Sequence, residues 1–469
     1  MRVTQSTRSI FLCLLGLLVA ATSGLPQDTQ YWTSQYGNRA RLLGGAVVGS
    51  ATDLSTVYYN PGLLALVEQP ELLLAANVVQ ATQVKIRDAL GQDEDLSSTR
   101  VGGAPSLFAG ELRLGFLGKH RLAYSFLTRH DLDLRLEARG AVRPDLAGLD
   151  PALDLLSVRL GFETRLSDYW AGLTWAVPLS EHLGLGVTQF VAIRSQRTRN
   201  TSVLQVRGDS LGGIALSGYD FEYQHWRLLW KVGVGAKFDR WRLGLAVTAP
   251  SLGLWGGGSI GLDETVIAAD LSQDGSSVSQ VVSDFQDDLS ADWKSPFSIA
   301  GGLSYSRRGG TRLHASAEWF DGVGPFTVMD AGPVATDDPT EVRDADVTEE
   351  FGSVLNAGFG VEQRFSENVE GYASFRTDFS AADPDTGASA SVTSWDIYHL
   401  AAGATFTVGR SDFTLGAVYG FGDAPTAARL TLIPDGEVAE PGVESEDLNR
   451  LDARFRRLTF ILGFAISFE

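Results

Sequence analysis

Two cations four residues apart are the first candidates for chemistry in this chain. Arg227 and Lys231 lie in a stretch where every second residue from Trp226 to Val234 is apolar. Side chains of a strand alternate between two faces, so Arg227 and Lys231 share the face opposite the apolar one. Two such cations can bind a carboxylate. We therefore predict a ligand-binding role for them, with pairing to acids on the same face as the alternative.

The same reasoning assigns other charged residues to that inner face. The further cations expected there are Arg113, Arg159, Arg165, Arg194 and Arg242. The acids expected to pair with them are Glu111, Glu163, Glu318 and Glu362.

Catalytic chemistry has little support in the sequence. The six histidines are scattered, and none has a Ser-His or Asp-His spacing typical of a catalytic site. His314 and Glu318 share one strand face, for which ordinary hydrogen bonding is the better interpretation. Metal-ligand clusters, phosphate-binding glycine loops and nucleotide signatures are absent from the sequence. We predict a protein that is not an enzyme and that has no cofactor and no metal.

The elements that must position these residues are β-strands. Apolar residues recur at every second position in about fourteen segments, the period of a strand. The last segment shows it most clearly, with one face formed by Leu458, Phe460, Leu462, Phe464, Ile466 and Phe468. An even number of such segments predicts an all-β fold, a transmembrane antiparallel β-barrel of about 14 strands with its apolar face toward lipid.

The connections between these segments alternate in length, as in outer-membrane barrels with short periplasmic turns and long external loops. Short joins are expected at 118–120, 180–182, 238–240, 307–310, 366–368 and 409–412. Long loops are expected at 87–104, 138–156, 207–217, 253–294, 322–350, 380–394 and 422–454. In the longest loop, VSQVVSDFQDDL is expected to form a short amphipathic helix, either packing within the loop or acting as a lid.

The N-terminus has the features of a secretory signal. Arg2 and Arg8 precede an apolar run over 10–21, followed by Thr22, Ser23 and Gly24. This run is too short to span a membrane, so residues 1–24 are predicted to be a signal peptide. The formal charge of −19 makes nucleic acid an unfavourable partner. Acidic stretches in three predicted loops are expected to be solvated rather than to bridge cations or lipopolysaccharide.

The segment between the signal and the first strand has a different character. It contains the stretch LGGAVVGSATDLSTVYYNPGLLAL, in which Asn60-Pro61 and a Gly-Gly pair disfavour a strand. Irregular backbone at membrane depth must be surrounded by protein or water. We therefore predict a plug over residues 25–68 inside a barrel formed by residues 69–469.

This stretch resembles the N-terminal hatch of the FadL-type outer-membrane transport proteins. The matching residues are Gly45, Asp53, Asn60 and Pro61, while Gly62 stands where the family usually has alanine. The resemblance implies a transporter for passive uptake of hydrophobic compounds such as long-chain fatty acids or aromatic hydrocarbons. It also implies a location in the outer membrane of a Gram-negative-type bacterium, in contact with membrane lipid and lipopolysaccharide, as an expected monomer.

A second family resemblance remains open. PorV-like barrels of a bacterial secretion system have a similar Asn-Pro hatch, and that resemblance implies a protein-interaction or shuttle role instead of transport. An open porin is disfavoured by the predicted plug.

Overall fold

The computed structural model describes most of the chain. The described residues are 29–67, 71–86, 96–103, 105–112, 114–142, 153–208, 211–270, 277–335, 342–343, 345–382, 395–427 and 450–467. The predicted signal peptide lies outside these residues. No helix in these ranges is long and apolar enough to cross a membrane.

The main sheet closes into a ring. Within the described ranges it has seventeen strands, of which β2, β9 and β10 extend the sheet and the other fourteen (17 − 3) form the ring. Every neighbouring pair is antiparallel, and β21 pairs with β1 to close the ring. In chain order the ring strands are β1 (Glu71–Ile86), β3 (Pro105–Leu112), β4 (Arg121–Val142), β5 (Leu153–Pro178), β6 (Leu183–Gly208), β7 (Leu211–Phe238), β8 (Trp241–Thr248), β11 (Ser298–Ser306), β12 (Thr311–Phe320), β17 (Val354–Ser366), β18 (Val369–Asp378), β19 (Ile397–Val408), β20 (Ser411–Ala427) and β21 (Arg450–Ser467). The prediction of a 14-stranded antiparallel barrel is confirmed.

The alternating pattern sorts side chains between the two faces of this ring. In β21, Phe460 and Leu462 are about half exposed on the outside, whereas Thr459 and Ile461 are buried inside. An apolar outer face of this kind can lie against lipid hydrocarbon at little cost in free energy, and the closed ring leaves few backbone groups without a hydrogen-bond partner.

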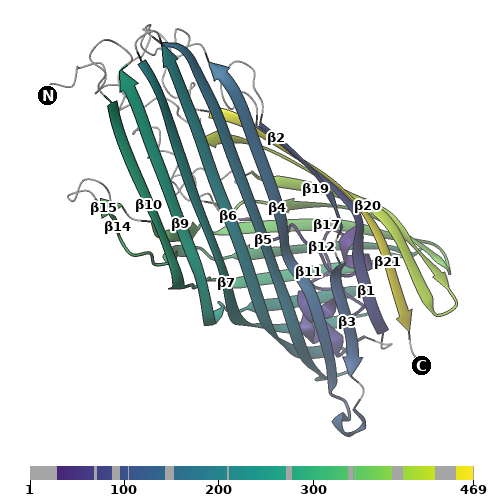
Figure 1. Cartoon of the computed structure of the whole chain (residues 1–469). Helices are drawn as coiled ribbons and strands as arrows, with labels where there is room; N and C mark the ends of the chain where they lie inside the picture. Colours follow the sequence, from purple (N-terminus) through teal and green to yellow (C-terminus); the bar gives the residue numbers. More distant parts are fainter. Residues whose placement is uncertain are drawn as a thin grey trace.

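One side of the ring is much taller than the other. Strands β5 and β6 have 26 residues each and β7 has 28, whereas a membrane span needs roughly 9–11. We call β4–β7 together with β9 (Leu252–Asp270) and β10 (Ser277–Ser290) the tall wall, seen in Figure 1 as long strands side by side. The short turns lie at the opposite end, which we call the turn end.

The tall wall corrects two sequence predictions. Residues 253–294 are not a loop with a helix, because β9 pairs with the outer part of β7 and β10 pairs with β9. In the expected helix, Val282 is buried while Val281 and Phe285 are exposed, a strand's alternation. The prediction of a loop at 207–217 is also wrong, because β6 continues to Gly208 and β7 begins at Leu211.

A small hairpin covers the inner face of the tall wall. Strand β13 (Val323–Met329) pairs with β16 (Val347–Phe351), and the short strands β14 (Val334–Ala335) and β15 (Val342–Arg343) pair between them. We call β13 and β16 the cap hairpin. Its apolar side chains join one buried cluster with those of the wall, including Phe326, Phe351, Tyr219, Phe221 and Tyr223.

The ring is incompletely paired at one position. Strand β2 (Leu96–Gly102) pairs with β1, and β3 pairs with β4 only as far as Leu127. No pairing joins β2 to β4 in the described residues, so facing strand edges are left unpaired there. Gly102, Gly103 and Pro105 separate β2 from β3, and glycine weakens a strand while proline lacks a ladder donor. We call this opening the β2/β4 gap.

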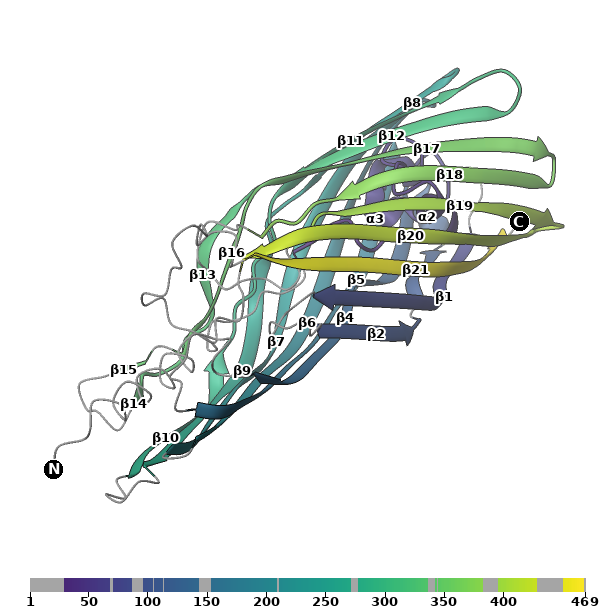
Figure 2. The ribbon, with the colours of Figure 1, turned by 90° about the horizontal axis from the view of Figure 1, so that it is seen from above.

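Residues 29–67, which we call the N-terminal segment, lie across the interior of the ring. The segment contains the short helices α2 (Asn38–Leu42), α3 (Thr56–Tyr59) and α4 (Pro61–Leu64). Outside the segment, a 3-10 turn, η1 (Gly115–Leu117), precedes β4. Helix α4 contacts β5, β6 and β7, while α2 contacts β18–β21 on the other side of the ring. Figure 2 shows these helices surrounded by strands.

Candidate functional site

Asn60 ties the N-terminal segment to the barrel. Its Nδ2 donates to the carbonyl oxygens of Val48, within the segment, and Val234, in β7, each at 2.9 Å. Its Oδ1 accepts from the backbone N–H of Gly62 at 3.1 Å, which caps α4, with Pro61 as the first helical residue. One side chain therefore fixes a turn, a helix start and a barrel contact.

Gly62 lies where backbone meets backbone. A Cβ at this position would be 2.4 Å from the carbonyl oxygen of Gly233 and 2.8 Å from that of Gly184. Glycine is therefore required for α4 to pack on β6 and β7, which explains the departure from the alanine usual in FadL-type hatches. Gly45 has a positive φ of 75°, which glycine adopts readily.

Asp53 has a local role. Its Oδ1 accepts from the backbone N–H of Ser55 at 2.9 Å and from the Ser55 hydroxyl. It thereby shapes the turn that leads into α3.

Charged and polar contacts attach the segment to the other side of the ring. Arg39 Nε donates to Glu362 at 2.7 Å, and the Ser50 hydroxyl lies 2.8 Å from His314 Nδ1. Trp32 Nε1 donates to Glu318 at 2.9 Å. His314 and Glu318 therefore have separate structural partners.

Arg227 and Lys231 both line one cavity of about 60 Å³, which we call the inner pocket. Arg227 Nη2 is 2.5 Å from Asp168 Oδ2, and its Nε donates to Ser295. Lys231 Nζ is 3.9 Å from Glu318 Oε1. Both cations are buried and each has an acid nearby: Glu318 is one of the acids expected from the sequence, whereas Asp168 was not predicted.

Several aromatic rings also line the inner pocket. Lys231 Nζ lies 4.6 Å above the ring of Tyr58, and Arg194 lies 3.7 Å from the ring of Trp293. Phe351 of the cap hairpin contacts Trp293 at a centroid distance of 5.5 Å. The N-terminal segment thus forms one side of the pocket and the cap hairpin another. Burial raises the pKa of Tyr58 well above its usual value, so its hydroxyl stays neutral.

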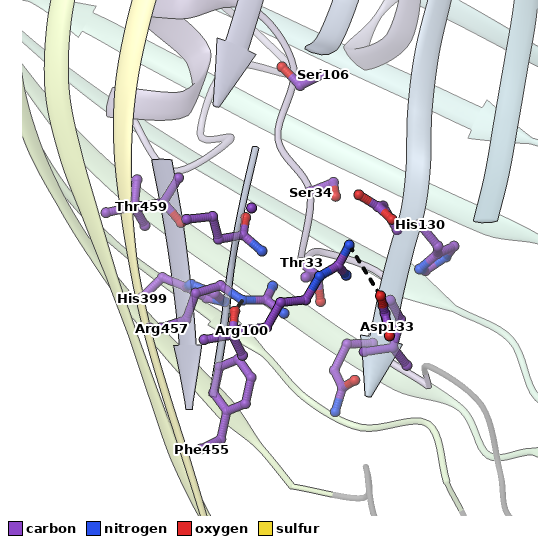
Figure 3. A pocket seen from close by; sticks show the side chains of 18 of the residues that line it. Thr33, Ser34, Arg100, Ser106, His130, Asp133, His399, Phe455, Arg457 and Thr459 are labelled. Atoms are coloured by element: carbon purple, nitrogen blue, oxygen red, sulfur yellow. Dashed lines mark hydrogen bonds and ion pairs between the residues drawn. The ribbon is translucent and has the colours of Figure 1, made fainter. Parts of the chain in front are cut away.

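A second cavity, which we call the gap pocket, lies behind the β2/β4 gap. Its volume is about 130 Å³, and its walls come from β1, β2, β4, β18–β21 and the N-terminal segment. Arg100 Nη2 and Asp133 Oδ2 approach to 3.7 Å across the gap, the contact dashed in Figure 3. For scale, a cavity of roughly 150 Å³ accommodates benzene.

The deeper wall of the gap pocket is positively charged. It includes Arg41 from α2, Arg376 from β18 and Arg457 from β21, whose Nε donates to Thr82 at 3.2 Å. Arg376 Nη2 donates to the carbonyl of Thr33, and its buried Nε has no hydrogen-bond partner among the residues that the structure describes. Burial lowers the pKa of Arg41 to about 10, which leaves it charged near neutral pH.

The structure revises part of the predicted inner-face set. Arg194 is buried inside, but Arg159 and Arg165 lie on the outer face, so that prediction is wrong. Strand β5 runs unbroken from Leu153 to Pro178, and both arginines therefore keep the outward orientation of Leu173. Glu163 faces outward for the same reason, and Arg113 lies outside the described residues.

Arg376 and Arg129 are among the pocket arginines that the sequence analysis did not predict. Arg376 follows the outward Phe375 in β18, so the parity argument used for Arg227 would have found it. Arg129 lies at an irregularity of β4 between Thr128 and His130, where alternation is interrupted and parity fails.

Comparison with known proteins identifies related architectures. No protein-family model and no curated protein matches the chain. The structure is similar to the toluene transporter TodX from P. putida, with a TM-score of 0.59 and 13% identity over 93% of this chain and 99% of that one. It is also similar to the toluene transporter TbuX from Ralstonia pickettii, with a TM-score of 0.54 and 12% identity over 93% and 99%. A FadL homologue from Pseudomonas aeruginosa matches with a TM-score of 0.56 and 12% identity over 95% and 99%. The chain therefore shares the barrel fold of the FadL-type transporters, the family that its Asn-Pro stretch resembles.

Proposed function

We propose that this protein lets hydrophobic compounds, such as long-chain fatty acids, cross the outer membrane passively. Three observations support the proposal: an apolar outer face on a closed ring, an interior occupied by the N-terminal segment, and transporters among the structures of the same fold. In this arrangement the tall wall is external and the turn end is periplasmic. The N-terminal segment acts as a plug against free aqueous flow.

The proposed path runs from the cap hairpin to the inner pocket, then to the gap pocket, and out through the β2/β4 gap. The observation that carries it is the gap pocket itself, an internal cavity that lies against unpaired strand edges. A solute that leaves sideways enters lipid directly, so its apolar part is never exposed to water.

Lys231 is the better of the two predicted residues for a solute carboxylate. Its distance of 3.9 Å from Glu318 is long, whereas Arg227 is held by Asp168 at 2.5 Å. Glu318 also accepts from Trp32 and Ser298, so it stays hydrogen-bonded if Lys231 turns toward a ligand. Arg227 then serves mainly to neutralise Asp168.

A cross-link across the gap tests the path. Cys13 is the only cysteine of the chain and lies in the predicted signal peptide, so R100C/D133C introduces a unique pair. A short bis-maleimide should link the pair and reduce uptake of labelled fatty acid into cells severalfold. The control S195C/Q224C, placed on opposed residues of β6 and β7, should cross-link without effect. Unchanged uptake in fully cross-linked R100C/D133C contradicts lateral exit.

A further inference from the structure

A furrow crosses the outer face of the tall wall, and it begins beside the β2/β4 gap. Its volume is about 990 Å³, and it passes over β4, β5, β6, β7, β9 and β10, with Arg100 of β2 at one end and Asp287 and Asp288 of β10 at the other. Three cross-strand rows define its position. The row nearest the turn end is Tyr169, Ile193, Trp226 and Trp255. The next row, which forms one rim, is Ser167, Ser195, Gln224 and Gly257. The other rim is Asp133, Arg165, Arg197, Glu222 and Ser259.

The furrow lies just beyond the aromatic boundary of the lipid-facing surface. Tyr169 and Trp255 are more than half exposed, and Trp226 stacks on Trp255 at 5.2 Å, as expected of an aromatic girdle at the membrane interface. Arg165 is four residues beyond Tyr169, which is about 13 Å along a strand and about 10 Å along the membrane normal at usual tilts. The rim of the furrow that contains Arg165 is therefore level with the outer polar layer of the membrane.

The charges along the rim that contains Arg165 and Arg197 are arranged as two cations between two acids. Arg165 and Arg197 are directly opposed in the β5–β6 ladder, and like charges in that relation repel. Arg197 has a loose ion pair with Glu222 at 3.5 Å, whereas Arg165 pairs with Glu163 of its own strand at 2.9 Å and more loosely with Asp133 at 3.9 Å. Both guanidinium groups are more than half exposed, so both can reach a ligand.

We infer that this furrow binds the phosphorylated sugar head group of an outer-leaflet glycolipid. A phosphate between Arg165 and Arg197 replaces their mutual repulsion with two charge-assisted contacts, for which guanidinium geometry is well suited. Asp133 and Glu222 confine the positive charge to the centre of the row. Small side chains along the furrow, Ser167, Ser195 and Ser259, leave room for a sugar ring. The inference rests on the outer-membrane location but not on transport.

The test compares lipid retention by the whole purified protein. Wild type, R165Q/R197Q and the control R307Q/R308Q are incubated with bisphosphorylated lipid A, dephosphorylated lipid A or phosphatidylethanolamine in EDTA and examined by native mass spectrometry. Arg307 and Arg308 are exposed in the turn between β11 and β12, so the control has the same charge change at the other end. Heat-modifiable gel migration checks that each barrel is folded.

Wild type and the control should retain lipid A equally, and R165Q/R197Q should retain at least tenfold less. D133N/E163Q/E222Q, which removes the three acids that pair with the two arginines, should retain more than wild type. The inference is overturned if R165Q/R197Q retains lipid A like wild type, or if wild type retains dephosphorylated lipid A or phosphatidylethanolamine equally well. Transport assays do not enter this result, so it stands or fails separately from the proposed uptake.

Discussion

At the scale of single residues, the turn formed by Asn60, Pro61 and Gly62 packs closely against the barrel strands. Asn60 donates to two carbonyls and accepts one N–H, all within about 3 Å. Such a fully satisfied buried amide is costly to replace, because each group left unpaired loses roughly 1–3 kcal/mol. The turn and the strand glycines beside it therefore form one packed unit.

Gly62→Ala should destabilise the protein although it restores the residue common in the related hatches. The new Cβ meets the Gly233 carbonyl, so α4 or β7 must shift, at a cost of about 1–3 kcal/mol. Urea unfolding in detergent micelles measures this cost. Gly301→Ala is the matched control, because a Cβ there meets nothing within 4 Å. Equal stabilities of the two variants would contradict the proposed packing role.

Lys231→Gln should separate charged from neutral solutes. We expect uptake of labelled fatty acid to fall severalfold, while uptake of a monoaromatic hydrocarbon stays near the wild-type rate, because only the carboxylate needs the cation. Lys237→Gln, the same change in β7 nearer the turn end, is the control. A parallel loss of both solutes would indicate a structural role for Lys231 only.

At the scale of elements, we expect the stability of the cap hairpin to depend on pH. Glu349 in β16 is buried, and burial raises the pKa of its carboxyl to about 8 despite the opposing effect of Arg194. The folded hairpin therefore holds a proton that an unfolded one releases near pH 4.5. This contribution to stability is complete below pH 4.5 and is lost as the pH rises through about 8.

Raising the pH from 6 to 9 should therefore loosen the cap hairpin. Hydrogen exchange at Val347–Phe351, corrected for intrinsic rates, should be faster at pH 9 in wild type. Glu349→Gln removes the titrating group and should show no such change. A pH-independent wild type would show that the carboxyl is already ionised in the folded hairpin.

The sequence predicted elements well where burial alone sets the pattern. In β8, β11, β12 and β17–β21 one face meets lipid, so the alternation of apolar residues is visible. The outer ends of β5–β7 carry Arg165, Arg197 and Glu222 instead of an apolar face, and the sequence predicts a loop at 207–217, where β6 ends and β7 begins. The acidic end of β10 also lacks an apolar face, so the sequence does not predict this strand.

The candidate site was predictable only in part. Parity placed Arg227 and Lys231 inside, because this needs only the chain's own alternation. The partner of Arg227, Asp168, lies 59 residues away, a relation that depends on barrel register. The gap had a signal in Gly102, Gly103 and Pro105, but nothing in the sequence says which neighbouring edge stays open.

At the scale of the whole molecule, the N-terminal segment should decide whether the barrel conducts ions. Deletion of residues 30–66 removes the chain that contacts β5–β7 on one side and β18–β21 on the other. We expect a several-fold rise in single-channel conductance in planar bilayers. The deleted protein must first show heat-modifiable migration, as a folded barrel does. Unchanged conductance in such a barrel would mean that the segment does not obstruct flow.

The two covers of the inner pocket come from distant parts of the chain. Tyr58 belongs to the N-terminal segment and Phe351 to the cap hairpin, and both line the same cavity. Under the proposed function, a solute would displace the cap hairpin and the N-terminal segment one after the other. The barrel would then not open to both sides of the membrane at the same time.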